Sequence, residues 1–183
     1  VLQSRARDAG VAAGVRAVQG DVDALADAVA DADADLVLGH GLLEYVDDPP
    51  EACRALAAAA TPGGAVSLLV AGRFAAVLSR VVSGRLTEAR RLLVDPRGRW
   101  GPDDPLSRRM DVEEIRTLVE AGGRLTVERV QGHRVLADLV PDTVLEAGGG
   151  PPESLAELED IAAGTPPLRD MASRLHVLAR RPG

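Results

Sequence analysis

Apolar residues along the chain fall into short runs that are separated by helical patterns. The runs are rich in Val, Leu and Ala, as buried strands are, and lie at residues 15–19 (VRAVQ), 34–39 (ADLVLG) and 65–72 (AVSLLVAG). Helices are predicted between them, at residues 21–30 behind the capping residue Asp21 and at residues 50–60, which begin with Pro and are rich in Ala. Strands that alternate with helices predict a parallel sheet with covering helices, hence an α/β fold.

The second half of the chain continues this alternation of strands and helices, with more turn-forming residues between them. Residues 73–93 are helical in pattern, and Pro, Gly and Asp at turn density predict a loop over residues 95–107. A helix is predicted from Asp111 to about residue 121, where two glycines end it. Strands are predicted at residues 124–132 and 173–181, and in the last strand Leu175, Val177 and Ala179 would share one face while His176 and Leu178 share the other.

Composition narrows the class of protein. The 183 residues suffice for one domain, and the net charge of −7 argues against a general nucleic-acid coat. Cys53 is the single cysteine, so no disulfide within the chain can form, and its Ala-rich helix predicts a buried, inert thiol. No apolar run reaches the roughly 18 residues of a membrane span, and no signal peptide is visible, so the cytoplasm is the expected location.

Two predicted strands end in residues that can contact a ligand. In an open α/β sheet ligands bind beyond the carboxyl ends of the strands. The first strand ends at Gly20-Asp21-Val22-Asp23, where a carboxylate and a free backbone amide can contact an adenine edge; Asp21 as a plain helix cap is the alternative. The other ends at Gly39-His40-Gly41, where glycine permits close approach and the imidazole can bind a ligand, or His40 is an ordinary loop histidine.

Other chemistry finds little support in the sequence. No His, Cys and acidic residues stand at metal-ligand spacing, and neither a Ser-His-Asp set nor a phosphate-binding loop is visible. Asp47-Asp48-Pro49 is interpreted as the entry turn of a helix. The sequence therefore predicts no metal and offers no catalytic residue.

Several segments together resemble a known family. Asp21-Val22-Asp23 after a strand, then ADLVLGHGLLEYVDDP, then TPGGAVSLLV are similar to the second half of class I S-adenosylmethionine-dependent methyltransferases. The resemblance implies a Rossmann-like sheet with flanking helices that lacks the first strands, and S-adenosyl-L-methionine as the cofactor. It also implies that Asp21, Val22 and Asp23 meet the adenine, while Gly39 and His40 lie beside the methionine part.

A finer resemblance covers nearly all of residues 1–183. LVLGHGLLEYVDDP, VVSGRLTEARRLL, DPLSRRMDVEEIRTLVEAGG, VQGHRVLADLVP and SRLHVLARRPG resemble tRNA 5-carboxymethoxyuridine methyltransferase and its bacterial relatives, which methylate a carboxylate on a wobble uridine. The family's glutamine is replaced by Asp23. The resemblance implies one methyltransferase domain over residues 1–183, with a helical and loop insertion at about 73–110.

Parts of the family pattern are absent from the sequence. Neither the glycine-rich first loop nor the acidic residue that holds the ribose is found, and the chain begins at Val1 within a helical pattern. We expect an N-terminally truncated domain in which residues 15–19 have no obvious neighbour. We therefore expect the 183 residues to be inactive by themselves.

Candidate acceptor contacts lie in an arginine-rich region. Between Arg85 and Arg109 there are seven Arg and four acidic residues, a local charge of +3, which fits an anion-binding lid or a solvated helix. Trp100 within it is a candidate for stacking on a base, or a hydrophobic plug under the loop. Arg134 follows a strand and is the candidate contact to a substrate carboxylate, with a surface arginine as the alternative.

The sequence thus favours a methyltransferase that transfers a methyl group to a carboxylate, such as that of 5-carboxymethoxyuridine in tRNA. A carboxylate is ionised near neutral pH and needs placement, about 3 Å from the methyl carbon, rather than a general base. Two alternatives stay open: a methyltransferase for a small carboxylate or hydroxyl metabolite, and a non-catalytic remnant that binds the cofactor or nothing.

Overall fold

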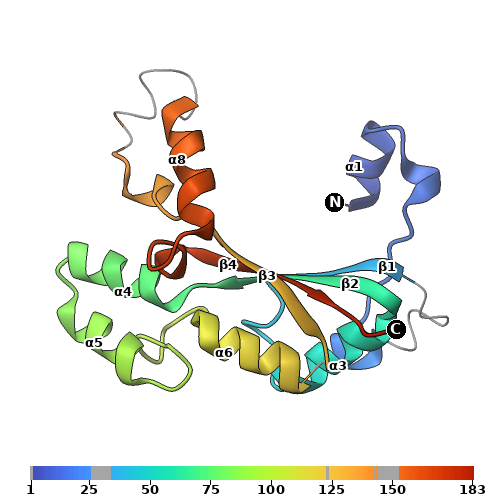
Figure 1. The fold of residues 1–183 in the computed structure, drawn as a ribbon, viewed down its shortest axis with the longest axis horizontal. Coiled ribbons are helices and arrows are strands. Elements are labelled where there is room, and N and C mark those ends of the chain that lie inside the picture. The colour runs from blue at the N-terminus through green and yellow to red at the C-terminus, as the bar shows by residue number, and fades with distance from the viewer. Residues whose placement is uncertain (1, 26–33, 123, 142, 144–152) are drawn as a thin grey trace.

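The computed structural model describes residues 2–25, 34–122, 124–141, 143 and 153–183 (Figure 1). Four strands form one sheet: β1 Ala34–His40, β2 Ala60–Ala71, β3 Thr126–His133 and β4 Arg174–Arg180. The α-helices are α1 Leu2–Asp8, α3 Pro49–Ala59, α4 Arg73–Val82, α5 Leu86–Val94, α6 Val112–Thr117 and α8 Glu153–Gly164. A π-helical turn, η3 Leu118–Gly122, continues α6, and short 3₁₀ turns are η1 Ala12–Gly14, η2 Val22–Ala24, η4 Ala137–Leu139 and η5 Arg169–Met171.

The strand order is β1-β2-β4-β3, with helices on both sides of the sheet (Figure 1). β1 and β2 are parallel, whereas β4 is antiparallel to both of its neighbours. The α/β prediction is confirmed, and β1 and β2 are parallel as predicted, whereas the last strand, β4, departs from the parallel arrangement. The face of the last strand was predicted correctly: Leu175, Val177 and Ala179 are fully buried, and His176 lies on the other face, half-buried.

Helix α3 packs against β1 and β2, and its first residues are stabilised by a local hydrogen bond. The Asp48 side chain accepts a hydrogen bond from the Glu51 backbone N at 2.9 Å, which confirms the entry turn. The helix buries Cys53 and Leu56 against the sheet. Burial raises the pKa of the Cys53 thiol to about 12, so the thiol stays protonated and inert at neutral pH.

The predicted strand at residues 15–19 is wrong. These residues have no regular structure, and β1 is the edge strand of the described sheet. A short apolar segment becomes a strand only where a neighbour supplies backbone donors and acceptors. The predicted helix at 21–30 begins as η2, and residues 26–33 lie outside the described part of the chain.

Segments beyond β2 follow the predictions with small shifts. β2 begins five residues earlier than predicted, at Ala60, because the turn at Gly63-Gly64 bonds to Arg181 and stays in the sheet. α4 and α5 form a helical pair, and the loop at 95–107 is confirmed. Asp111 starts α6 with a full capping box in which it exchanges hydrogen bonds with Glu114.

None of the helices in the described part of the chain is both long enough and apolar enough to cross a membrane.

Candidate functional site

One edge of the sheet gathers the ends of several strands. β1 ends at His40 and β2 at Ala71, and because β4 runs the opposite way it begins at this edge with Arg174. Ala71 pairs with Arg174, and Arg174 also pairs with His133 at the end of β3. This edge is where an α/β sheet binds its ligands.

His40 is exposed on the face of the sheet that points away from α3. Its Nε2 lies 2.9 Å from Ser67 Oγ, and the same oxygen lies 2.8 Å from His176 Nε2. A hydroxyl carries one proton, so Ser67 donates to one ring and accepts from the other. The two rings meet edge to face with centroids 6.1 Å apart, which fixes the orientation of His40.

The contacts of His176 predict that the stability of the folded protein depends on pH. Burial lowers the pKa of His176 below its ordinary 6.5, and the charges of His40 and His133 lower it further. The unfolded chain therefore binds the proton more readily, so stability is complete above the ordinary pKa and falls as the pH drops through it. We expect the midpoint of urea unfolding to fall between about pH 7.5 and pH 5.5, and to fall less in His176→Gln. Equal falls in both proteins would contradict this.

The predicted adenine contacts lie at η2. Asp21 occupies the N-cap position, but its exposed side chain makes no capping hydrogen bond to η2, so the purely structural alternative loses its main support. Val22 is half-buried against the core, and η2 contacts α3. Asp23 lies within η2, and its side chain falls outside the described part.

Gly39 has a packing reason for having no side chain. A Cβ built on it would come within 2.8 Å of both Leu56 Cδ1 and Leu68 Cδ2. The glycine thus lets α3 press onto β1 and β2, on the face opposite His40. Since η2 lies against α3, the structure does not gather Val22 and His40 into one side-chain cluster, and their common contact to a cofactor stays a prediction.

A cavity of about 920 Å³ opens beside the strand ends. Its floor includes Ala71 and Gly72 at the end of β2, and α4 forms one wall. Three arginines from distant parts of the chain line it: Arg109, Arg134 and Arg174.

Arg134, the predicted carboxylate contact, does line this cavity, but it already has a partner. Its Nε donates to Asp138 Oδ1 at 2.7 Å, its Nη2 bonds to the same oxygen, and Ser173 donates to the other oxygen of Asp138. These hydrogen bonds lower the pKa of Asp138, Arg134 first among them, although burial opposes the effect. Arg134 is exposed and can exchange its partner for a ligand only at the cost of this pair.

Arg174 was missed by the sequence analysis, which assigned no role to Glu44. Glu44 is 2 % exposed, and its Oε1 accepts from the Ala71 backbone N at 2.8 Å and lies 3.7 Å from Arg174 Nη1. Its Oε2 is buried without a hydrogen-bond partner among the described residues. Recognising β4 as antiparallel would have found Arg174, because only then does its first residue fall at the ligand edge.

Trp100 lies elsewhere, in the loop between α5 and α6. The Arg80 guanidinium carbon sits 5.0 Å from its ring centroid, so one face of the ring has a cation-π partner. Asp104 stabilises this loop, because its carboxylate accepts hydrogen bonds from both terminal nitrogens of Arg109. Burial alone would raise the pKa of Asp104, but hydrogen bonds from Arg109 and two backbone amides lower it. Trp100 does not line the 920 Å³ cavity, and base stacking stays a prediction.

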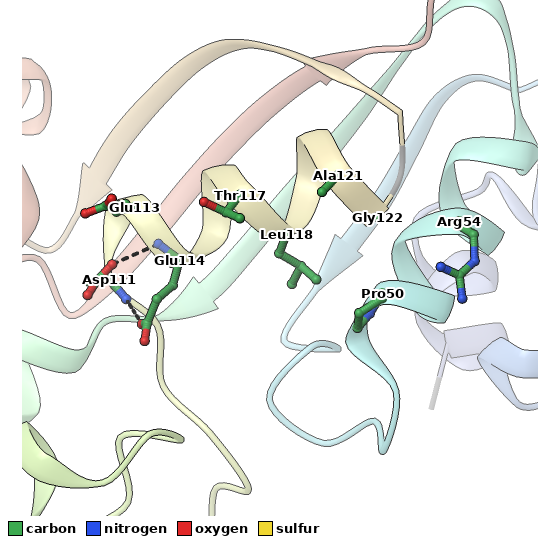
Figure 2. Close-up of a pocket in the computed structure, with 9 residues that line it drawn as sticks. All are labelled: Pro50, Arg54, Asp111, Glu113, Glu114, Thr117, Leu118, Ala121 and Gly122. Carbon is green, nitrogen blue, oxygen red and sulfur yellow. Dashed lines mark hydrogen bonds between the residues drawn. The ribbon is translucent and has the colours of Figure 1, made fainter.

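A second cavity of about 680 Å³ lies between α3 and α6 (Figure 2). Two of its three acidic residues are occupied by helix capping, since Asp111 and Glu114 bond to each other's backbone N, and the third is Glu113. No residue of the predicted site lines it.

The sheet order, the flanking helices and the ligand edge define a Rossmann-like fold of the class I methyltransferase type. Residues 1–68 match a family model described as a methyltransferase domain. No curated protein sequence matches the chain significantly.

Solved structures agree on the fold. An S-adenosylmethionine-dependent methyltransferase from Mesorhizobium loti is 22 % identical with a TM-score of 0.56, over 97 % of this chain and 75 % of that one. An O-methyltransferase family protein from Burkholderia thailandensis is 12 % identical with a TM-score of 0.53, over 100 % of this chain and 40 % of that one. The [4+2]-cyclase SpnF is 14 % identical with a TM-score of 0.55, over 98 % of this chain and 60 % of that one. The chain thus spans less than two thirds of the last two, and the likeness defines a fold that serves more than one chemistry.

Proposed function

We propose that this protein is an S-adenosylmethionine-dependent methyltransferase that acts in the cytoplasm. The observation that carries the proposal is the strand-end edge, where exposed His40 on β1 and a cavity lined by arginines lie at the carboxyl ends of parallel strands. The family match over residues 1–68 and the methyltransferases among the structural neighbours support S-adenosylmethionine as the cofactor.

The residues present fit such a cofactor in part. The exposed carboxylate of Asp21 makes no cap to its own helix and can accept from an adenine amine, and the backbone of Val22 and Asp23 can donate to the ring. The exposed ring of His40, held by Ser67, would border the methionine part, next to Gly39. The glycine-rich first loop of the family pattern is not found in the sequence, so we propose that residues 1–183 by themselves do not turn over.

The proposed acceptor is a carboxylate. Its oxygen attacks the methyl carbon, the bond from that carbon to the sulfonium breaks, and the products are a methyl ester and S-adenosylhomocysteine. A carboxylate is ionised at neutral pH, so no base is required, and the protein's task is to hold the acceptor in line.

Two kinds of molecule carry such a carboxylate. The family resemblance suggests 5-carboxymethoxyuridine in tRNA, with Arg134 on the carboxylate and Trp100 on a base. The net charge of −7 and the apolar wall of the cavity favour a small metabolite. Binding of tRNA would weaken steeply with added salt, whereas binding of a small acid would change much less.

The first test is calorimetric titration of S-adenosylmethionine into the natural full-length protein and its His40→Ala variant. We expect the variant to bind about tenfold more weakly, since it loses one ordered contact to the ligand. His133→Ala is the matched control, because His133 is also exposed at a strand end but is not assigned to the cofactor. A folded protein that does not bind, or equal weakening in both variants, would reject the proposed site.

A further inference from the structure

The cavity of about 920 Å³ beside the strand ends has an apolar wall that is exposed to water. α4 supplies Ala75, Leu78 and Val82, and Leu106 and Leu139 continue the surface. Val82 is 83 % exposed and Leu139 is 57 % exposed. Large apolar side chains exposed at a concave surface are typical of a site that binds an apolar group.

The lining of the same cavity is also cationic. Three arginines and one aspartate, Asp138, line it, so the lining has a net charge of +2 in a chain whose net charge is −7. Such a local reversal of sign attracts an anion to this place on the surface.

Arg174 is the arginine best able to bind that anion. Arg109 and Arg134 already form hydrogen bonds with Asp104 and Asp138. The Arg174 side chain is 47 % exposed, and within the described part of the chain its guanidinium has only the ion pair with Glu44 at 3.7 Å, which is too long for a hydrogen bond. Its donors can therefore take up a carboxylate in the fork geometry that arginine favours.

Glu44 is the group that positions Arg174. It is buried, its Oε1 is fixed by the Ala71 backbone N, and the same oxygen lies 3.7 Å from Arg174 Nη1. An ion pair of this kind holds a cation in place without occupying all of its donors.

We propose that this cavity binds the methyl acceptor, and that the acceptor is a small amphipathic carboxylic acid. Its carboxylate lies on Arg174 and its apolar body lies along α4 beside Val82. This inference rests on the proposed methyltransferase function and names its substrate class. A polyanionic RNA fits less well, because its phosphates would face the exposed valine and leucine rather than cations.

The position of Arg174 suits methyl transfer. Arg174 and His176 are two residues apart on β4 and so share a face, and His176 is joined to His40 through Ser67. A carboxylate on Arg174 therefore lies on the face of the sheet where His40 would border the cofactor.

The test uses octanoate as the probe, with the full-length protein and calorimetric titration. Octanoate should bind, hexanoate should bind more weakly by roughly threefold to fourfold for each methylene removed, and uncharged 1-octanol should bind at least about tenfold more weakly than octanoate. S-adenosylmethionine is titrated into the same preparation.

Variants assign the two ends of the ligand. Arg174→Gln should weaken octanoate binding about tenfold or more, while Arg180→Gln, on the same strand and paired with Glu128 away from the cavity, should not change it. Val82→Asp, at a side chain too exposed to affect folding, should weaken octanoate binding as well and leave S-adenosylmethionine binding intact.

The outcomes separate the two proposals. Binding of S-adenosylmethionine without octanoate, octanoate affinity unchanged in Arg174→Gln, or binding of a tRNA anticodon stem-loop in place of octanoate would each overturn the amphipathic acid. Octanoate binding that depends on Arg174 and Val82, without any S-adenosylmethionine binding, would keep the cavity assignment and reject its role in methyl transfer.

Discussion

Gly72→Ala should lower the free energy of unfolding by about 3 kcal/mol or more, because the new methyl group has no space. A Cβ on Gly72 would lie 2.1 Å from the Ala172 backbone O, far inside van der Waals contact. The glycine cannot move away, since its N donates to Ser173 O at 2.9 Å and it forms a bridge with Met110. The damage would reach the cavity, because Arg174 follows Ser173.

Urea unfolding of Gly72→Ala and of the matched variant Gly101→Ala measures this effect. Gly101 has only the end of Arg91 near its missing Cβ, at 3.5 Å, so its stability should stay within about 0.5 kcal/mol. If both variants unfold at the same urea concentration as the parent, β2 and the segment before β4 are not in the close contact described.

Arg108→Met should cost about 3 kcal/mol of stability, because a buried guanidinium holds the loop that follows β1. Arg108 is 9 % exposed, and its Nη1 donates to Leu43 O at 2.8 Å and also bonds to Val46 O. Methionine keeps the apolar stem but leaves these carbonyl oxygens without their donor. The neighbouring Ser107 N also donates to Glu44 O. Loss of the Arg108 contacts would therefore let the loop after β1 separate from the segment that precedes α6.

The matched control is Arg90→Met, at an exposed arginine of α5. We expect it to change the unfolding midpoint little, and to leave S-adenosylmethionine affinity unchanged while Arg108→Met weakens it through the loosened loop. Equal unfolding midpoints in the two variants would mean that Arg108 does not fasten the loop after β1.

The sequence sufficed where local pattern and tertiary packing agree. PEACRALAAAA became α3, because it has a strong local preference and a face that is buried in the core. ADLVLG became β1 as predicted, but it is not a buried strand, since Leu36 and Leu38 are 53 % and 59 % exposed and Gly39 alone of its residues is buried. Asp48 and Asp111 were correctly interpreted as helix starts, since capping depends on neighbours a few residues away.

The errors arose where structure depends on distant partners. VRAVQ has the composition of a strand, yet no strand forms without a neighbour. Arg174 was overlooked because strand direction, which brings it to the ligand edge, is not encoded in its own segment. The packing reason for Gly39 also depends on distant partners, since Leu56 and Leu68 fill the space where its Cβ would lie, and its contact to a ligand stays a prediction.

The central claim, that the cofactor lies at the carboxyl ends of β1 and β2, is tested most directly by a crystal structure of the full-length protein with S-adenosylhomocysteine. We predict electron density for the ligand beside His40 and Gly41, with its adenine near Asp21. Well-ordered ligand in another place, such as the groove between α3 and α6, would contradict the account.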